Sequence, residues 1–204
     1  MSDRLATSLA GIIVLALILS GLAPFDRTTW WLEVAPVLIA LPALIATRRR
    51  FPLTPLLYWV IFVHAGVLIA GGAYSYARVP LGFWLQDALA LSRNPYDKIG
   101  HFMQGLTPAL LTCEVLLRGG YMRLSKVWRM TVFLAICVAM AISACYELIE
   151  WGAAVALGQG ADEFLGTQGD PWDTQSDMLM AFLGASFAML CLRAWHTRQM
   201  QRLG

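Results

Sequence analysis

Residues 5–23, LATSLAGIIVLALILSGLA, form an apolar stretch without a single charged side chain. A helix needs about 20 such residues to cross the hydrocarbon core of a bilayer. One arginine, Arg4, precedes the stretch and no A-x-A cleavage motif follows it, so we interpret it as an uncleaved span rather than a secretory signal. The whole chain has the same character. Of its 204 residues, 58% are hydrophobic and 14% charged, which is too apolar for a soluble domain.

Five further apolar stretches predict spans of similar length. The segment between the third and fourth stretches, residues 73–93, is too short and polar to span, and we expect an outer loop there with a surface-lying helix around Leu81–Leu91. The predicted fold is therefore an all-α polytopic membrane protein, a bundle of about six transmembrane helices in a single membrane domain, 1–204. Residues 1–72 hold three spans with few polar groups, and residues 94–204 hold three spans that carry the polar motifs. The six spans are Leu5–Ala23, Trp31–Thr47, Leu53–Gly72, Pro95–Leu117, Val127–Leu157 and Thr174–Trp195.

The basic residues predict the orientation. With six spans, 11 of the 15 Lys and Arg residues fall on one side, which the positive-inside rule assigns to the cytoplasm together with both termini. By the same count, 11 of the 13 acidic residues lie at or near the extracytoplasmic face, including Glu33 near one end of the second span. Membrane insertion and anionic lipid head groups account for the basic loops. The charge pattern thus indicates the lipid bilayer as partner and gives no reason to expect nucleic acid.

Carboxylates are concentrated in the second half of the chain. Between Met130 and Leu192 there is no Lys, Arg or His, yet this segment includes the acidic loop 163–177, EFLGTQGDPWDTQSD. Carboxylates in a low-dielectric environment must be neutralised by protons, by basic partners or by a cation. The carboxylates of this segment are Glu147, Glu150, Asp162, Glu163, Asp170, Asp173 and Asp177.

Three predicted spans each place polar side chains on one helix face near the extracytoplasmic surface. Spacings of three and four residues put side chains on the same face of a helix. Asn94 and Pro95 fit the N-cap and the first position of the fourth span. The polar faces are Asp97/His101/Gln104, Glu147/Glu150 and Asp173/Asp177.

Several of these residues also have local explanations. Thr174 and Asp177 match the spacing of a capping box, and Glu114 can pair with Arg118 one turn further along. Small residues continue the Asp177 face toward the cytoplasm, at Ala181, Gly184 and Ala188, and would let another helix approach closely.

Together the polar faces indicate one convergent site. Its carboxylates outnumber the nearby bases, so a divalent metal ion would suit it. Carboxylates with a histidine suit zinc, manganese or iron, and carboxylates alone suit calcium or magnesium. The candidate metal ligands are Asp97, His101, Glu147, Asp173 and Asp177. The candidate catalytic residues are Glu147, Glu150 and Asp177, with Gln104, Lys98, Asp170 and Gln175 as supporting polar groups.

Five stretches carry a resemblance to a known family: YDKIGHFMQGLTPALL (96–111), EVLLR (114–118), YELIEW (146–151), FLGTQGDPWDTQSDM (164–178) and Gly184–Ala185. In these the chain resembles the YjdF-like family of bacterial inner-membrane proteins. The resemblance implies a multi-pass protein of the bacterial inner membrane and no particular activity.

A weaker similarity links the chain to VanZ-like membrane proteins, through Asp97, Lys98, His101, Glu147 and Asp177. The asparagine usual in that pattern after the last acid is missing here. This similarity implies a link to cell-envelope lipids or glycopeptide tolerance.

Three functions are compatible with these features. The first is a metal-assisted enzyme acting on a lipid-linked or envelope substrate, with Glu147 or Glu150 as general base. The second is a cation or polar-lipid binding or transport protein, and the third is a structural scaffold. The polar stripe ends near Pro108 and the cytoplasmic half is nearly free of polar groups apart from Glu114, which argues against a transport path. The chain has no H-E-x-x-H, G-x-S-x-G or C-x-x-C motif.

Overall fold

The computed structural model describes residues 2–122, 124–157 and 168–203, and all regular structure within these ranges is helical. This confirms the predicted all-α class. The elements are α1 (Ser2–Leu22), α2 (Arg27–Thr47), α3 (Pro55–Tyr74), the short 3-10 turn η1 (Tyr76–Arg78), α4 (Pro80–Ala88), α5 (Tyr96–Arg118), α6 (Leu124–Leu157), α8 (Asp173–Phe187), the π-helical stretch η3 (Ala188–Leu192) and α9 (Arg193–Met200).

Side-chain caps set where the second and third helices begin. The carboxylate of Asp26 accepts a hydrogen bond of 2.6 Å from the backbone N–H of Thr29, so α2 starts at Arg27, four residues before the predicted span. Thr54 caps α3 in the same way, and Pro55 occupies the first helical turn, where its missing N–H costs nothing.

Among the described residues, five helices are long and apolar enough to cross a membrane. They are Arg4–Leu22, Arg27–Thr47, Pro55–Tyr74, Trp128–Ala156 and Asp173–Met200. The 23-residue α5 is not among them, and it carries polar side chains along its length, at His101, Gln104 and Glu114. The chain is therefore a multi-span helical protein.

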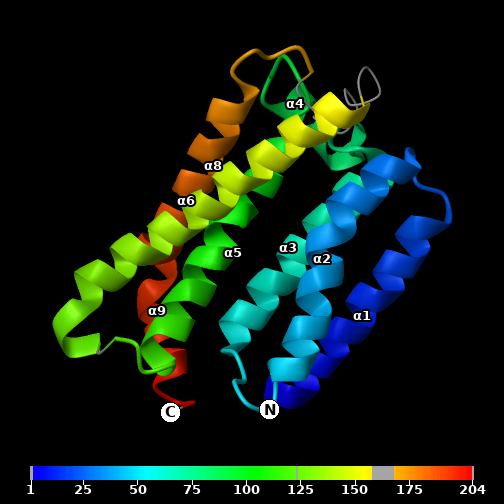
Figure 1. Cartoon of the computed structure of the whole chain (residues 1–204). Helices are drawn as coiled ribbons and strands as arrows, with labels where there is room; N and C mark the ends of the chain where they lie inside the picture. The colour runs from blue at the N-terminus through cyan, green and yellow to red at the C-terminus, as the bar shows by residue number, and fades with distance from the viewer. Residues whose placement is uncertain (1, 123, 158–167, 204) are drawn as a thin grey trace.

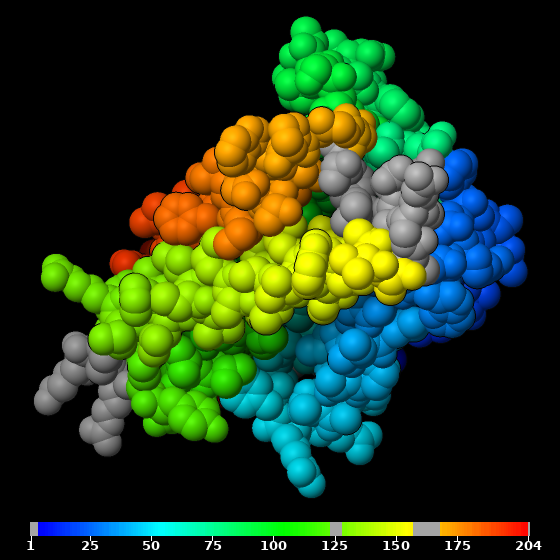
Figure 2. Space-filling model, turned by 45° about the horizontal axis from the view of Figure 1, so that its top comes forward, coloured from blue at the N-terminus to red at the C-terminus, as the bar shows by residue number. Residues whose placement is uncertain are grey.

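The helices form two groups, as Figure 1 shows: α1–α3 on one side, and α5, α6 and the α8–α9 rod on the other. Contacts between α3 and α5 join the groups. Both chain termini lie at one end of the bundle, which we call the terminal end. At the opposite end α5 and α8 begin, and we call this the site end. Figure 2 shows that α4 and the residues after it project from the site end.

The closest helix pair is α5 and α8. A Cβ atom added at Gly105 of α5 would overlap the backbone carbonyl oxygen of Ala181, and one added at Gly184 of α8 would overlap that of Phe102. The predicted role of the small residues on α8 is therefore confirmed. Because the backbones approach so closely, side chains one turn toward the site end, such as Asp177, must face α5.

A second polar cluster lies near the terminal end, around Glu114, which the prediction named as the polar exception in this half; Thr54 and His196 add to it. Glu114 of α5 is fully buried and accepts hydrogen bonds from the backbone N–H of Thr54 at 3.0 Å and from its hydroxyl at 2.8 Å. Its other contacts are Arg118, as predicted, and His196 Nε2 at 2.8 Å. His196 comes from α9, so this cluster ties α3, α5 and α9 together.

Candidate functional site

The start of α5 fixes the position of the polar face that the sequence predicted. The helix begins at Tyr96 rather than Pro95, but the side chain of Asn94 still accepts a hydrogen bond from the Tyr96 N–H at 3.0 Å. The Asn94 amide also donates to the carbonyl oxygen of Val79 at 3.1 Å, which ties the segment before α4 to the start of α5. The first turn of α5, which carries Asp97 and precedes His101, is therefore held in place by Asn94.

Three of the predicted ligands meet across the α5–α8 contact. Nε2 of His101 lies 3.4 Å from Oδ1 of Asp97 and 3.8 Å from Oδ1 of Asp177, and one ligand atom from each residue falls within 4.8 Å of the other two. His101 and Asp177 are buried and Asp97 is half-buried. Metal–ligand bonds of roughly 2.1 Å in tetrahedral geometry place neighbouring ligand atoms about 3.4 Å apart, close to the first of these distances.

Glu147 of α6 approaches the same histidine from the opposite side. Its Oε1 lies 3.7 Å from Nδ1 of His101, and Gln104 Oε1 lies 3.2 Å from that nitrogen. The Glu147 side chain is 7% exposed, and within the described parts of the chain Oε1 has no hydrogen-bond partner. A buried carboxylate oxygen without a partner is costly, so a hydrogen-bond donor or a cation at this position would be stabilised by it.

Lys98 joins the α8 acids to α5. Its ammonium nitrogen lies 2.8 Å from Asp173 Oδ1 and 2.6 Å from Asp177 Oδ1, and it donates to the hydroxyl of Ser176 at 2.7 Å. The capping-box explanation of Asp177 is wrong, because α8 begins at Asp173 and its N-cap residue makes no side-chain capping bond. The local pattern gives way to the stronger tertiary ion pair with Lys98.

Arg93 holds the other predicted acids of this loop. Its guanidinium lies 2.7 Å from Asp173 Oδ1 and 2.8 Å from Asp170 Oδ2. Burial alone would lower the pKa of Arg93, but the hydrogen bond and charge of Asp173, with the charge of Asp170, raise it above its ordinary value. Arg93 therefore stays charged and neutralises this end of α8.

Glu150 and Glu33 bring further acid to the site end. Glu150 is buried beside the cluster, as its spacing from Glu147 predicts. Glu33 of α2 is 2% exposed and accepts a hydrogen bond of 3.2 Å from the Tyr146 hydroxyl of α6. The sequence analysis did not include Glu33 and Tyr146 in the site, although an ionisable residue within a span was a signal for Glu33.

One predicted supporting residue does not join the cluster. Gln175 is exposed on α8, on the face opposite Asp173 and Asp177. Asp162 and Glu163 lie outside the described residues.

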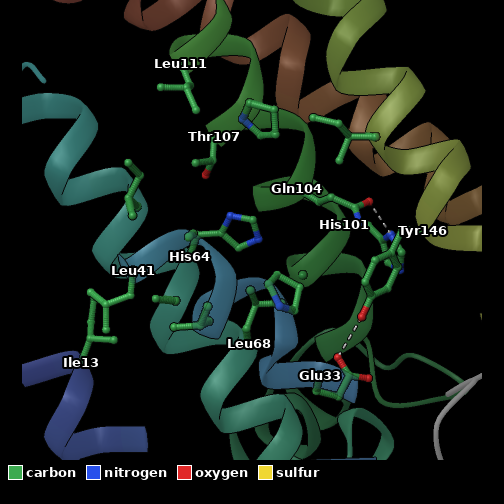
Figure 3. Close-up of a pocket in the computed structure, with 18 of the residues that line it drawn as sticks. Ile13, Glu33, Leu41, His64, Leu68, His101, Gln104, Thr107, Leu111 and Tyr146 are labelled. Carbon is green, nitrogen blue, oxygen red and sulfur yellow. Dashed lines mark hydrogen bonds between the residues drawn. The ribbon is translucent and has the colours of Figure 1, made fainter. Parts of the chain in front are cut away.

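A cavity of about 430 Å³ opens beside the cluster, between the two helix groups. Figure 3 shows residues that line it: His101, Gln104 and Tyr146 lie on the side of Glu33, Leu41 lies across the cavity from them, and Leu111 lies far from Glu33. His64 of α3 also projects into this space.

Tyr76 of η1 forms part of the wall at the polar end of the cavity. Burial, and then the charge of the nearby Glu33, raises the pKa of Tyr76 well above its ordinary value. Its hydroxyl is therefore neutral at pH 7.

The helical bundle and its buried polar groups define a polytopic membrane protein. The chain belongs to the family described as "Predicted membrane protein (DUF2238)", whose model matches residues 5–198. It is 58% identical to the inner membrane protein YjdF of Escherichia coli (strain K12) over 192 residues, which cover 94% of this chain and 90% of that protein. No solved structure matches the chain.

These matches confirm the predicted resemblance to the YjdF-like family, and with it a multi-pass protein of the bacterial inner membrane. The similarity to VanZ-like proteins and the link to the cell envelope stay predictions.

Proposed function

We propose that this protein is a metal-assisted enzyme that acts on the head group of a lipid-linked substrate at the extracytoplasmic face. The observation that carries the proposal is the meeting of Asp97, His101 and Asp177, whose ligand atoms lie within 4.8 Å of one another. A bound divalent ion would supply Lewis-acid chemistry there, either polarising a substrate oxygen or activating water.

The topology in this proposal has six spans, both termini in the cytoplasm and one membrane domain. Support comes from the position of both termini at one end of the bundle, which requires an even number of crossings. The α5 helix runs beside the five apolar spans and supplies the sixth. The excess of basic residues at the terminal end supports a cytoplasmic location for that end. The site end then faces the extracytoplasmic side, and α4 lies in the interface with its large apolar side chains exposed to lipid.

Each residue has a proposed role that follows from its contacts. Asp97, His101 and Asp177 hold the ion, and Gln104 orients the His101 ring through Nδ1. Glu147 lies 3.7 Å from Nδ1, on the other side of the ring from these ligand atoms, so we assign it the role of general base rather than that of a ligand.

The remaining acids surround this centre. Glu150 lines the cavity next to it and is the alternative general base. Asp173 lies outside the three ligand atoms that meet and pairs with Arg93 and Lys98, so we assign it the role of holding Lys98 beside Asp177 rather than that of a ligand. Asp170 supports Arg93 in the same way.

A metal-loading experiment tests the proposal. Protein purified in mild detergent is stripped with a chelator, loaded separately with Zn²⁺ and Mn²⁺, and its bound metal is measured by elemental mass spectrometry. Wild type should retain about one ion per chain, and His101→Ala and Asp177→Asn should lose it. The matched control is Gln175→Ala, an exposed position two residues from Asp177, which should bind as wild type does. Failure of wild type to retain either metal would refute the proposal.

A turnover assay separates catalysis from binding. Reconstituted protein is incubated with an extract of bacterial envelope lipids, and products are identified by lipid mass spectrometry. Loss of a head group with wild type but not with Glu147→Gln that still binds metal would support the enzyme. Metal binding without any lipid product would contradict it and favour the second candidate, a cation or polar-lipid binding or transport protein. For that candidate the Glu114 cluster supplies polar groups at the terminal end. A scaffold with a structural polar core would give neither metal nor product.

A further inference from the structure

The cavity beside the cluster is long and runs parallel to the helices. On α5 its lining extends along one face from Asp97 to Leu111, a distance of about 21 Å at 1.5 Å per residue. On α2 it extends from Glu33 to Leu44, or about 16 Å. One leaflet of a bilayer contributes about 15 Å of hydrocarbon. The cavity therefore has the length of a lipid chain in one leaflet.

Its volume also matches one chain. A buried apolar cavity of roughly 150 Å³ accommodates benzene, which has six carbon atoms. On that scale the 430 Å³ of this cavity accommodates on the order of 15 carbon atoms. Pockets that bind small molecules measure roughly 300–1,000 Å³.

The distribution of polarity gives the cavity a direction. Glu33, Asp97 and Glu150 line the site end, where His101 is the nearest base, so this end carries an excess of acid. Toward the terminal end the walls are mainly aliphatic, with Leu44 of α2 and Leu111 of α5. A molecule with hydrogen-bond donors at one end and a hydrocarbon chain at the other would match the acidic end and the aliphatic end of the cavity.

Two of the helices that line the cavity contain a proline. Pro36 within α2 and Pro108 within α5 both line the cavity, on opposite walls. A proline inside a helix removes a backbone hydrogen bond and its ring disturbs the preceding turn, which favours a bend at that point. Each wall therefore lacks one backbone hydrogen bond beside the cavity.

We propose that this cavity binds the single hydrocarbon chain of an amphiphile whose hydroxyl-bearing head group lies against Asp97, His101 and Glu150. This inference rests on the proposed function, since it names the class of substrate that would reach the metal centre. It places the chain between the helix groups and the reactive head group at the site end.

Photocrosslinking tests the site directly. The probe is a monoacylglycerol with a 16-carbon chain that carries a diazirine at its middle, added to wild-type protein in detergent micelles. Peptide mass spectrometry should map most crosslinks to cavity-lining positions such as Leu41, Ala65 and Leu68. Excess unlabelled monoacylglycerol should reduce these crosslinks at least fivefold. Crosslinks confined to outward-facing residues such as Ile39, which is 73% exposed, would overturn the proposal.

A matched pair of variants on α3 gives a second test. Ala65 is buried and lines the cavity, so the ring of Ala65→Phe has only the cavity to occupy and should reduce crosslinking at least fivefold. Val63→Phe, two residues away and 50% exposed on the outside of α3, should leave it unchanged. Equal crosslinking in both variants would overturn the proposal, and the wild-type map applies even if Ala65→Phe does not fold.

Metal-site variants distinguish this inference from the proposed function. His101→Ala should lose the metal yet keep crosslinks near Leu41 and Leu68, because the chain contacts lie away from the ligands. Crosslinks in the cavity of a protein that never binds metal would refute the enzyme and leave the chain site standing. Metal binding with no cavity crosslinks would refute the chain site and leave the metal centre standing.

Discussion

The ion pair between Lys98 and Asp177 gives the sharpest test of how the site is held together. Lys98→Met removes the ammonium 2.6 Å from a carboxylate that is only 2% exposed. Removing one partner of a buried pair costs about 3–5 kcal/mol. We expect the lower value, about 3 kcal/mol, because Lys98 is itself 19% exposed and Arg93 still neutralises Asp173.

The reverse change should cost less. In Asp177→Asn the ammonium keeps Asp173 and Ser176 as partners, so we expect a loss of about 1 kcal/mol in the free energy of unfolding. The double variant never contains an unpaired buried carboxylate at position 177 and should lose about 2 kcal/mol. The two substitutions should therefore couple by about 2 kcal/mol.

The assay is reversible unfolding in mixed micelles, with increasing SDS and with helix content followed by circular dichroism. The control is Gln175→Ala, which should change the free energy of unfolding by less than about 0.5 kcal/mol because its side chain is exposed. A coupling below about 0.5 kcal/mol would show that Lys98 and Asp177 do not depend on each other, and the reasoning about this ion pair would be refuted.

Three further predictions concern the rest of the fold. Gly184→Ala should destabilise the protein by about 1–3 kcal/mol through overlap with α5, whereas Gly152→Ala, with open space around it, should be neutral or slightly stabilising in the same unfolding assay. A hydrogen bond from the backbone N–H of Thr29 holds the pKa of Asp26 below its ordinary value. Asp26→Ala should therefore lower the free energy of unfolding by about 1 kcal/mol above about pH 4. This difference between variant and wild type should shrink as the pH falls through the pKa of Asp26 in the folded protein. Unfolding curves of wild type and variant at several pH values check this sign, and Asp26→Asn, which keeps the cap without titrating, should show no such trend. His196→Ala should cost about 1–3 kcal/mol because it leaves the buried Glu114 with one fewer donor, and thermal melts that match wild type would contradict this.

The apolar runs and the helix periodicity were enough to predict the framework. Long uncharged stretches predict helices because backbone groups in lipid must be satisfied within the helix itself. The spacing of Asp97, His101 and Gln104 identified the polar face of α5, and the small residues around Gly184 identified the face of α8 that packs on it. Both inferences rest on the helical periodicity of side chains, which can be recognised in the sequence of a single helix.

The sequence could not indicate contacts between distant helices. Glu33 and Tyr146 are more than 100 residues apart, and neither α2 nor α6 alone shows that their polar groups meet. The same holds for Glu114 and His196, which are brought together by the packing of α9 against α5. The capping box at Asp177 failed for a related reason, since a local pattern was outweighed by a lysine 79 residues earlier.

X-ray absorption at the zinc edge tests the central claim most directly. On Zn²⁺-loaded protein the account predicts about four nitrogen and oxygen ligands at roughly 2.0–2.2 Å, with the outer-shell scattering of one histidine ring. In His101→Gln the bound zinc should be largely lost, and any zinc that remains should show no ring signal. A spectrum without histidine, or a histidine signal that survives the substitution, would contradict a metal centre at Asp97, His101 and Asp177.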